Sequence, residues 1–294
     1  MNRRWLQLRV RPRGDADLSP LLVEGLFALG ARAAEERDGW YVTAVEEPAD
    51  LDAFVAGARA NLSAMAGSDD FDFEVEWRSH EDWAETWKRG LAPRQVTERI
   101  LVRPSWTPAP PGAPAIEIVI DPGMAFGTAE HGTTRGCLRL LDRTVQPGGR
   151  VLDVGAGSGI LAIAAARLGA DEVTAIEADA LACEALRDNL VLNGVGDRVR
   201  CVEAMVGPDD LAVLGPVAGI VANIESRPLT ALMSGFVRAL APGGWLILSG
   251  IMAQEWPTVR GAAEAEGLHF REVDEDGEWR SALFERTRGA RPLD

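Results

Sequence analysis

The feature that most constrains the fold is an alternation of short apolar runs and helical segments that begins near Ala115. Eight runs have the composition of strands: 115–120, 150–155, 172–177, 198–203, 218–224, 244–250, 268–274 and 281–287. Four helical segments with glycine near the C-terminal end lie between them: 159–169, 178–194, 227–244 and 254–267. This alternation predicts a parallel sheet covered by helices on both faces. The last two strands have no clear helix between them, which predicts an antiparallel hairpin at the sheet edge.

Residues 1–77 show a different pattern, in which strand-like and helical stretches follow the order β-α-β-β-α-β. The strands are expected at 4–10, 31–36, 40–45 and 71–77, and the helices at 18–31 and 50–65. Asp38-Gly39 is a tight-hairpin dipeptide, Gly30 is placed to end the first helix, and Asp50 is placed to cap the second. This order predicts a small ferredoxin-like α+β domain.

The segment between these parts, residues 78–115, has the character of a linker that carries a helix. Trp83 and Trp87 lie four residues apart on one helical face, which favours packing between domains over a ligand site. The run "TPAPPGAP" is a proline-rich connector. We therefore predict a ferredoxin-like domain at 1–77, a linker at 78–115 and an α/β domain at 116–294.

The charge and the cysteines of the chain limit its partners. The 294 residues carry a formal net charge of −15, which disfavours a nucleic-acid-binding face because phosphates require basic residues. No apolar run has the roughly 18 residues that a membrane helix needs, and the N-terminus lacks a secretory signal. Cys137, Cys183 and Cys201 form no Cys-x-x-Cys pair, so we expect neither disulfides nor a metal site. These features favour a cytoplasmic protein, and we expect a monomer.

A glycine loop follows the strand at 150–155, in the run "VLDVGAGSGI". Open α/β sheets bind ligands at this place, and Gly155 and Gly157 allow a ligand to approach the backbone. A dinucleotide fingerprint needs glycine at the position of Ile160. Asp153 would repel a pyrophosphate, but it suits an ammonium group. S-adenosylmethionine carries an ammonium and a sulfonium group and no phosphate, so we predict that the loop binds this cofactor.

Two further side chains follow strands of the same predicted sheet. Glu177 ends the second strand, where a carboxylate can accept hydrogen bonds from ribose hydroxyls; the alternative is a solvated strand end. Asn223 ends the fourth strand and offers an acceptor and donors to an amine; the alternative is a helix cap. With the glycine loop, these residues make the chain resemble the seven-strand, Rossmann-like S-adenosylmethionine-dependent methyltransferases.

The run "DPGMAFGTAEHGTTRG", from Asp121 to Gly136, lies just before the cofactor strand. We expect it to fold over the glycine loop as a lid with an exposed Phe126. A helix should start in it with Thr133 or Thr134 as the N-cap, and such a helix N-terminus suits the carboxylate of the cofactor. His131 more often has a structural than a catalytic role in such a context.

The same run carries a more specific resemblance. It is similar to the D-P-G-x-A-F-G-T-x-x-H-x-T-T-x-x-C-L-x-x-L signature of the ribosomal protein L-eleven (L11) methyltransferase family. The similarity extends to "WKRGLAPRQVTERILVRPSW" upstream, and to "NIESRPL" and "LSGIMAQE" downstream. By motif it covers about residues 83–257, and in the N-terminal domain it depends on the order of elements alone.

This resemblance implies N-methylation of lysine side chains and the N-terminal amine of a large-subunit ribosomal protein. It implies that the ferredoxin-like domain recognises the substrate and that a mobile linker lets the catalytic domain reach more than one amine. The cofactor contacts of the family carry over to Thr134, Gly155, Glu177 and Asn223. Glu177 replaces the usual Asp and keeps its charge. Glu225 and Arg227 replace residues that are commonly small or apolar, which bears on substrate choice.

The expected reaction is an in-line attack of a neutral amine on the sulfonium methyl group. Phe126 and Ile224 are candidates for an apolar pocket that favours the neutral amine, and Asn223 and His131 for its orientation. The residues identify no general base. Three alternatives stay open: a small-molecule or nucleic-acid methyltransferase on the same fold, a cofactor-binding protein without turnover, and an amine methyltransferase with a non-ribosomal protein substrate.

Overall fold

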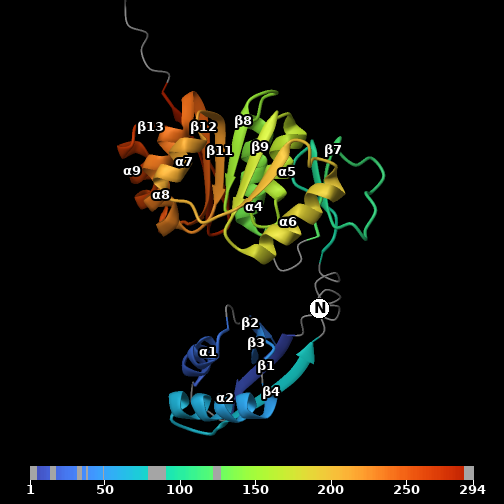
Figure 1. The fold of residues 1–294 in the computed structure, drawn as a ribbon, viewed down its shortest axis with the longest axis vertical. Helices are drawn as coiled ribbons and strands as arrows, with labels where there is room; N and C mark the ends of the chain where they lie inside the picture. The colour runs from blue at the N-terminus through green and yellow to red at the C-terminus, as the bar shows by residue number, and fades with distance from the viewer. Residues whose placement is uncertain are drawn as a thin grey trace, which may run out of the picture. The chain divides into compact units, whose positions relative to one another are not determined.

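The computed structural model describes residues 5–13, 18–31, 35–37, 39–48, 50–78, 91–121 and 127–287. The chain divides into two compact units, Met1–Gly90 and Leu91–Asp294, and each has its own sheet and core (Figure 1). None of the described helices is both long and apolar enough to cross a membrane.

Within its described residues, the N-terminal unit contains a four-stranded antiparallel sheet and two helices. Its elements are β1 (Trp5–Pro12), α1 (Ser19–Ala28), β2 (Glu35–Arg37), β3 (Trp40–Glu46), α2 (Leu51–Ala66) and β4 (Phe71–Arg78). The strand order is β2-β3-β1-β4. The apolar side chains of β1 and β4 pack with Leu22 and Leu26 of α1 and Leu62 of α2 in one buried core. The predicted order of elements is therefore confirmed.

Local signals in this unit act as the sequence indicates. The side chain of Asp50 accepts a hydrogen bond from the amide of Ala53 at 3.0 Å, which confirms it as the N-cap of α2. Gly30 follows the last turn of α1 with a φ of 94°, in the left-handed region where helices commonly end. Along β1, Leu6, Leu8 and Val10 alternate into the core, as a half-buried strand requires.

The C-terminal unit is built on a seven-stranded sheet in the order β10-β9-β8-β11-β12-β14-β13. Its strands are β8 (Arg150–Val154), β9 (Glu172–Glu177), β10 (Val199–Glu203), β11 (Val217–Asn223), β12 (Leu240–Met252), β13 (Leu268–Asp276) and β14 (Trp279–Arg286). The first five strands in the sheet order are parallel, whereas β14 pairs antiparallel with both β12 and β13. The seven-strand Rossmann-like fold and the edge hairpin are confirmed.

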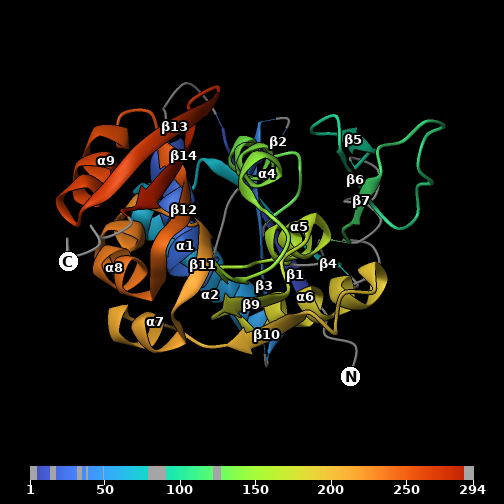
Figure 2. The ribbon, with the colours of Figure 1, turned by 90° about the horizontal axis from the view of Figure 1, so that it is seen from above.

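Helices cover both faces of this sheet (Figure 2). One buried core joins it to α4 (Gly132–Thr144), α5 (Ile160–Leu168) and α6 (Ala180–Asn193), and a second core joins it to α7 (Pro208–Leu214), α8 (Ser226–Ala239) and α9 (Trp256–Ala265). The helix expected at 227–244 ends earlier, at Ala239. Leu240 already pairs with Val217 of β11, and Pro242 lacks the amide that a helix would use.

A separate three-stranded sheet, β5-β6-β7, precedes the large one. It consists of β5 (Arg94–Gln95), β6 (Ile100–Arg103) and β7 (Ile116–Val119), with β6 and β7 parallel. Ile100, Val102 and Ile118 join the buried core that contains α4 and α5. The second unit therefore begins at Leu91, although the sequence placed residues up to 115 in a linker. Trp83 and Trp87 lie outside the described residues.

Candidate active site

The glycine loop lies at the carboxyl end of β8 and is hydrogen-bonded to β9. The amides of Gly155 and Ala156 both donate to the carbonyl of Ile176 in β9, at 2.9 and 3.0 Å. Gly155 has a φ of 74°, a backbone conformation that residues with a side chain rarely adopt. A Cβ at this position would also lie 2.3 Å from Cγ2 of Ile224. The loop therefore needs glycine for its conformation and for close contact with the β11–α8 segment.

Glu177, at the tip of β9, is held by the backbone around it. Its Oε2 accepts the amide hydrogen of Gly157 at 2.8 Å, and its Oε1 accepts those of Ala178 and Asp179 at 2.8 and 3.0 Å. The carboxylate is therefore fixed in one orientation beside the glycine loop rather than free in solvent. It retains about one of its four acceptor positions for a ligand hydroxyl.

Asp153 is the most unusual side chain of the site. It lies in β8 and has no solvent exposure, and no side chain among the described residues pairs with its carboxylate. Burial raises the pKa of Asp153 to about 7; the hydrogen bond from the backbone amide of Ala162 opposes this rise, and the nearby charge of Glu177 adds to it. A buried carboxylate without a counter-charge is costly. The cationic group of a ligand would supply that charge, so this carboxylate fits the ammonium of S-adenosylmethionine.

The first turn of α4 contributes Thr134, which is fully buried, and its Oγ1 has no partner within the described ranges. The prediction that Thr133 or Thr134 caps this helix is wrong. The N-cap is His131, whose backbone is extended with φ −83° and ψ 136°. Both threonines lie inside the helix and not before its first residue. The Thr133 hydroxyl does not cap the helix but is hydrogen-bonded to Nδ1 of His131 at 2.7 Å.

His131 makes contacts of a structural kind. Its ring lies 4.8 Å from that of Trp279, the first residue of β14, at an angle of 55°. Burial, followed by the charge of Arg135, lowers the pKa of His131 below its usual value of 6.5. The imidazole is therefore neutral at pH 7, and one of its two nitrogens is engaged with Thr133. The contact of His131 with Trp279 was not predicted, because a tryptophan at the start of a strand usually indicates ordinary packing.

Asn223 ends β11 directly opposite Ser249 in β12 and is half-buried. Its alternative role as a helix cap is wrong, because α8 begins at Ser226 with Glu225 as the N-cap. The predicted contact of its amide with an amine ligand stays a prediction. Glu225 and Arg227 are exposed on the first turn of α8.

The structure describes the segment predicted as a lid except for residues 122–126, so Phe126 lies outside the described residues. At one end, the backbone amide and carbonyl of Asp121 bond to the side chain of Asn189 at 2.9 and 3.2 Å. At the other, the carbonyl of Gly127 accepts the hydroxyl of Ser158 at 2.6 Å. Asn189 also donates to the carbonyl of Ser158 at 2.9 Å. Both flanks of residues 122–126 are thus tied to the turn that holds the glycine loop.

The motif glycines of α4 serve packing. A Cβ at Gly136 would lie 2.2 Å from Oγ of Ser281 in β14. The hydroxyl of Ser281 lies 2.7 Å from that of Ser249, and the Ser249 hydroxyl donates to the carbonyl of Thr133 at 3.2 Å. This buried network joins the first turn of α4 to β12 and β14, next to Asn223.

Two arginines of α4 hold the same helix against β13. Arg135 donates to both carboxylate oxygens of Asp276 at 2.9 and 2.7 Å, and Arg139 does the same with Asp274 at 2.8 and 2.5 Å. The guanidinium of Arg135 lowers the pKa of Asp276 to about 2. These ion pairs could have been predicted from the sequence. The two arginines lie four residues apart, as on one face of a helix, and the two acids lie two residues apart, as on one face of a strand.

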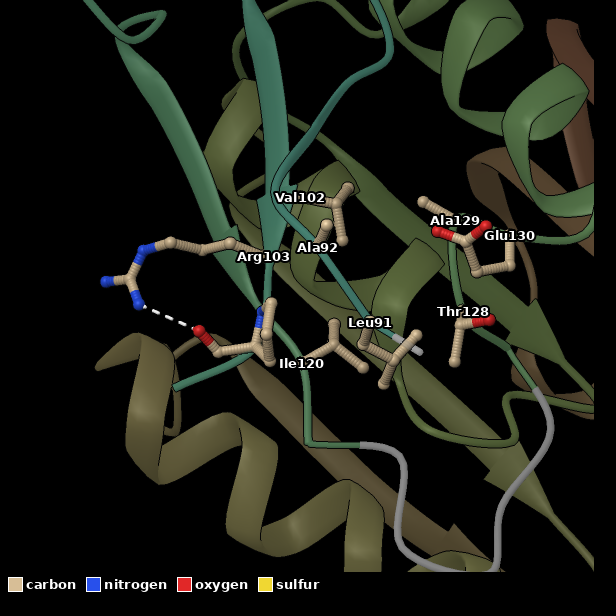
Figure 3. A pocket seen from close by; sticks show the side chains of 9 residues that line it. Leu91, Ala92, Val102, Arg103, Ile120, Thr128, Ala129 and Glu130 are labelled. Atoms are coloured by element: carbon tan, nitrogen blue, oxygen red, sulfur yellow. Dashed lines mark hydrogen bonds between the residues drawn. The ribbon is translucent and has the colours of Figure 1, made fainter. Parts of the chain in front are cut away.

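The small hollow in Figure 3 is separate from these residues. It has a volume of about 20 Å³ and is lined by Leu91, Ala92, Val102, Arg103, Pro104, Ile120, Thr128, Ala129 and Glu130. That volume holds about one water molecule. Figure 3 shows the Arg103 guanidinium directed away from the other lining side chains, toward the carbonyl of Pro104 at 3.0 Å. Within the described residues, no group of His, Cys, Asp or Glu is placed to hold a metal ion.

The six predicted cofactor residues lie at one edge of the sheet. The predicted set is Thr134, Asp153, Gly155, Gly157, Glu177 and Asn223. Parallel strands β8, β9 and β11 bring the ends that carry five of them together, and the α4 network places Thr134 beside the same edge. This arrangement offers an unpaired acid, a fixed acid and an amide around a glycine loop.

Comparison with known proteins gives one family. Its sequence model, described as Ribosomal protein L11 methyltransferase (PrmA), matches residues 31–287. A relative from Pelotomaculum thermopropionicum named Ribosomal protein L11 methyltransferase is 45% identical over 206 residues, covering 68% of this chain and 64% of that protein. One of the same name from Pelobacter propionicus is 40% identical over 217 residues, covering 70% and 67%.

A solved structure agrees with these relatives. The crystal structure of a ribosomal protein L11 methylase from Lactobacillus delbrueckii subsp. bulgaricus matches with a TM-score of 0.61 and 29% identity, covering 66% of this chain and 98% of that one. The match to the Pelotomaculum relative spans about two thirds of that relative's length, and the family match spans most of both units. The chain therefore belongs to the ribosomal protein L11 methyltransferase family.

Proposed function

We propose that the protein transfers methyl groups from S-adenosylmethionine to lysine side chains, the N-terminal amine, or both, of a large-subunit ribosomal protein of the L11 type. Membership of the family supports the reaction and the substrate class. The observation in this chain that carries the proposal is the buried carboxylate of Asp153, which has no cationic side chain paired with it among the described residues and lies beside the glycine loop.

The chain's residues hold the donor at three places. Asp153 faces its ammonium group, and the hydroxyl of Thr134 at the start of α4 faces its carboxylate. Glu177 uses its remaining acceptor position for a ribose hydroxyl, and Gly155 and Gly157 leave room for the ligand along the loop. The donor supplies a methyl group that a positive sulfur activates toward nucleophiles, so the protein mainly contributes orientation and exclusion of water.

The acceptor amine lies at the end of β11. A lysine amine has a pKa of about 10.4 in water and must lose its proton before it attacks. Contact with Ile224 favours the neutral amine because an apolar surface disfavours charge. The amide oxygen of Asn223 accepts one of its N–H groups, which orients the lone pair. His131, neutral and bonded to Thr133, supports the helix that carries Thr134.

The N-terminal ferredoxin-like unit, predicted at residues 1–77, recognises the substrate protein in this proposal, and residues from 116 onward carry the chemistry. The net charge of −15 supports attraction of a basic ribosomal protein and disfavours nucleic acid. We also propose that the protein works as a cytoplasmic monomer that does not associate with membranes.

The test is methyl transfer by the purified full chain with isotope-labelled S-adenosylmethionine. The acceptors are the L11 protein, a mixture of the other large-subunit proteins, and free lysine, and mass spectrometry maps each added methyl group. Transfer to amines of the L11 protein is the expected result. Transfer to free lysine alone, or to no protein, would contradict the proposal, and calorimetry with S-adenosylhomocysteine would show whether the cofactor still binds.

A further inference from the structure

Glu255 lies in the turn between β12 and α9, in the run "LSGIMAQE". It is the N-cap residue of α9, but its side chain makes no capping bond to that helix. Its Oε2 instead accepts the hydroxyl of Ser226 at 2.8 Å and the amide of Met252 at 3.1 Å. An acidic N-cap usually bonds to the free amides of its own helix. Here the carboxylate connects two turns that are 29 residues apart in the chain.

Ser226 is the first residue of α8 and follows Asn223 and Ile224. The N-cap of α8, Glu225, makes no side-chain capping bond. The carboxylate of Glu255 therefore brings a negative charge to the start of α8 from another part of the chain, where the helix dipole favours it. The start of α8 and the end of β12 are thereby fixed to each other.

The short segment between Asn223 and Ser226 is confined on its other sides as well. The side chain of Ile224 packs on the glycine loop, where a Cβ at Gly155 would lie 2.3 Å from its Cγ2. Its carbonyl packs on β12, where a Cβ at Gly250 would lie 2.2 Å from its oxygen. These contacts place the segment between the glycine loop and β12. At its downstream end, the Ser226 hydroxyl donates to Glu255, in addition to the bond from the Leu229 amide to the carbonyl of Glu225 within α8.

We infer that Glu255 is a positioning residue for methyl transfer, which holds the Asn223–Ser226 segment so that the acceptor amine meets the donor in line. This inference rests on the proposed function. It follows from the hydrogen bonds because loss of the carboxylate would leave the Ser226 hydroxyl and the Met252 amide without their acceptor. A displacement of about 1 Å at a reacting group can lower a rate by as much as 100-fold.

The experiment compares four variants of the full chain: Glu255→Ala, Glu255→Gln, Ser226→Ala and Glu264→Ala. Glu264 is the matched control, because it lies on α9 and pairs with Arg260 on the surface at 2.9 Å. The amide oxygen of glutamine can accept both hydrogen bonds, so Glu255→Gln tests rescue. The measurements are hydrogen exchange of the peptide 220–230 without substrate, and kcat and KM for S-adenosylmethionine with the L11 protein.

We expect Glu255→Ala to speed exchange in residues 223–226 at least tenfold and to lower kcat about tenfold, with the donor KM changed less than twofold. Ser226→Ala should change exchange and kcat in the same direction but by less. If Glu255→Ala does not fold, the Ser226→Ala variant is used in its place. Glu255→Gln and Glu264→Ala should behave like the parent. The inference is overturned if Glu255→Ala, or Ser226→Ala in its place, matches Glu264→Ala in exchange and kcat, or if Glu255→Gln is as impaired as Glu255→Ala. Exchange needs no turnover, so an inactive parent would reject the proposed function while exchange still decides the inference.

Discussion

Two glycine-rich segments lie near the same edge of the large sheet, and they use glycine for different purposes. In the loop at 155–159, glycine permits a left-handed backbone, and the strand beneath it buries Asp153 without a side-chain counter-charge among the described residues. In the first turns of α4, Gly136 lets the helix approach Ser281. Apart from the buried Thr134 hydroxyl, the polar groups around that contact are joined in hydrogen bonds and ion pairs.

The difference separates a ligand site from a scaffold. Polar groups that serve the fold are satisfied by the protein, because an unpaired buried group destabilises it. A carboxylate that is buried without a counter-charge in the free protein is best explained by a cationic partner from outside. Satisfaction of the buried polar atoms therefore separates Asp153 and Thr134, the two candidate ligand contacts, from the scaffold around Gly136 better than glycine content does.

The largest effect should come from Asp153→Asn. The variant keeps the shape of the side chain and removes the charge that would pair with the donor ammonium. We expect the affinity for S-adenosylmethionine to fall about 100-fold, the scale of a broken buried ion pair, as measured by titration calorimetry. Unchanged affinity would show that Asp153 does not contact a cationic group.

The same variant should gain stability, with a definite pH dependence. The pKa of Asp153 is about 7 in the folded protein and ordinarily 3.8, so the folded state binds the proton more tightly than the unfolded state. The parent therefore loses stability as pH rises from about 4 to 7. Asparagine has no charge to bury, so the gain should be about 4 kcal/mol at pH 8 and vanish near pH 4 in denaturant unfolding. A gain that is equal at both pH values would argue against a buried charge.

Gly136→Ala should affect the scaffold and spare the ligand site. The added Cβ would clash with Ser281 and separate α4 from β14, so the free energy of unfolding should fall by about 1–3 kcal/mol. Under conditions in which the variant is folded, its affinity for S-adenosylhomocysteine should stay within about threefold of the parent, because α4 contributes one of several contacts. Gly261→Ala is the control, since a Cβ there meets nothing within 4 Å. Equal effects of the two variants would remove the contrast between the segments.

Glu177→Gln should have an intermediate effect. Glutamine offers one acceptor oxygen where the carboxylate offers two, so its NH₂ group must face the amide of Gly157 or those of Ala178 and Asp179. We expect about tenfold weaker binding of S-adenosylhomocysteine, with Glu172→Gln at the exposed start of β9 as control. Retention of full affinity would place the ribose elsewhere.

The smallest effect should come from Glu225→Ala. Glu225 is exposed and makes no capping bond, so the free energy of unfolding should change by less than about 0.5 kcal/mol. If its charge attracts basic residues of the substrate, kcat/KM for the L11 protein should fall about threefold at low salt and little at high salt. Arg227→Ala, which removes an opposite charge from the same turn, should have the reverse effect. The same change in both variants would exclude an electrostatic role.

Much of this arrangement could be predicted from sequence because its signals are local. Strand and helix periodicity predicted the strands of the seven-stranded sheet, and parallel order then brought Asp153, Glu177 and Asn223 to one edge. The eighth predicted strand, 115–120, does not belong to this sheet, because β7 pairs with β6 in the separate three-stranded sheet. The cap at Asp50 and the glycine turns depend on neighbouring residues, so they too could be predicted from the sequence. The binding roles of the site residues remain predictions.

Features that depend on distant partners were harder to predict. The pairing of β6 with β7 moves residues 91–115 from the expected linker into the second unit, and only tertiary contact reveals it. The cap of α4 is His131 and not a threonine because the helix already begins at Gly132, so both threonines lie inside it. The bond between Ser226 and Glu255 joins residues that are 29 positions apart, a separation that periodicity does not encode. The short α7 is below the length at which a helical pattern is distinctive.

The burial of Asp153 has a consequence for the protein's lifetime in the cell. A ligand that neutralises this carboxylate binds the folded chain and not the unfolded one, so each rise in its concentration lowers the fraction of molecules that open. Chains that open are the ones that proteases degrade. The abundance of this protein should therefore follow the supply of methyl donor, falling when the donor is depleted even if synthesis is constant.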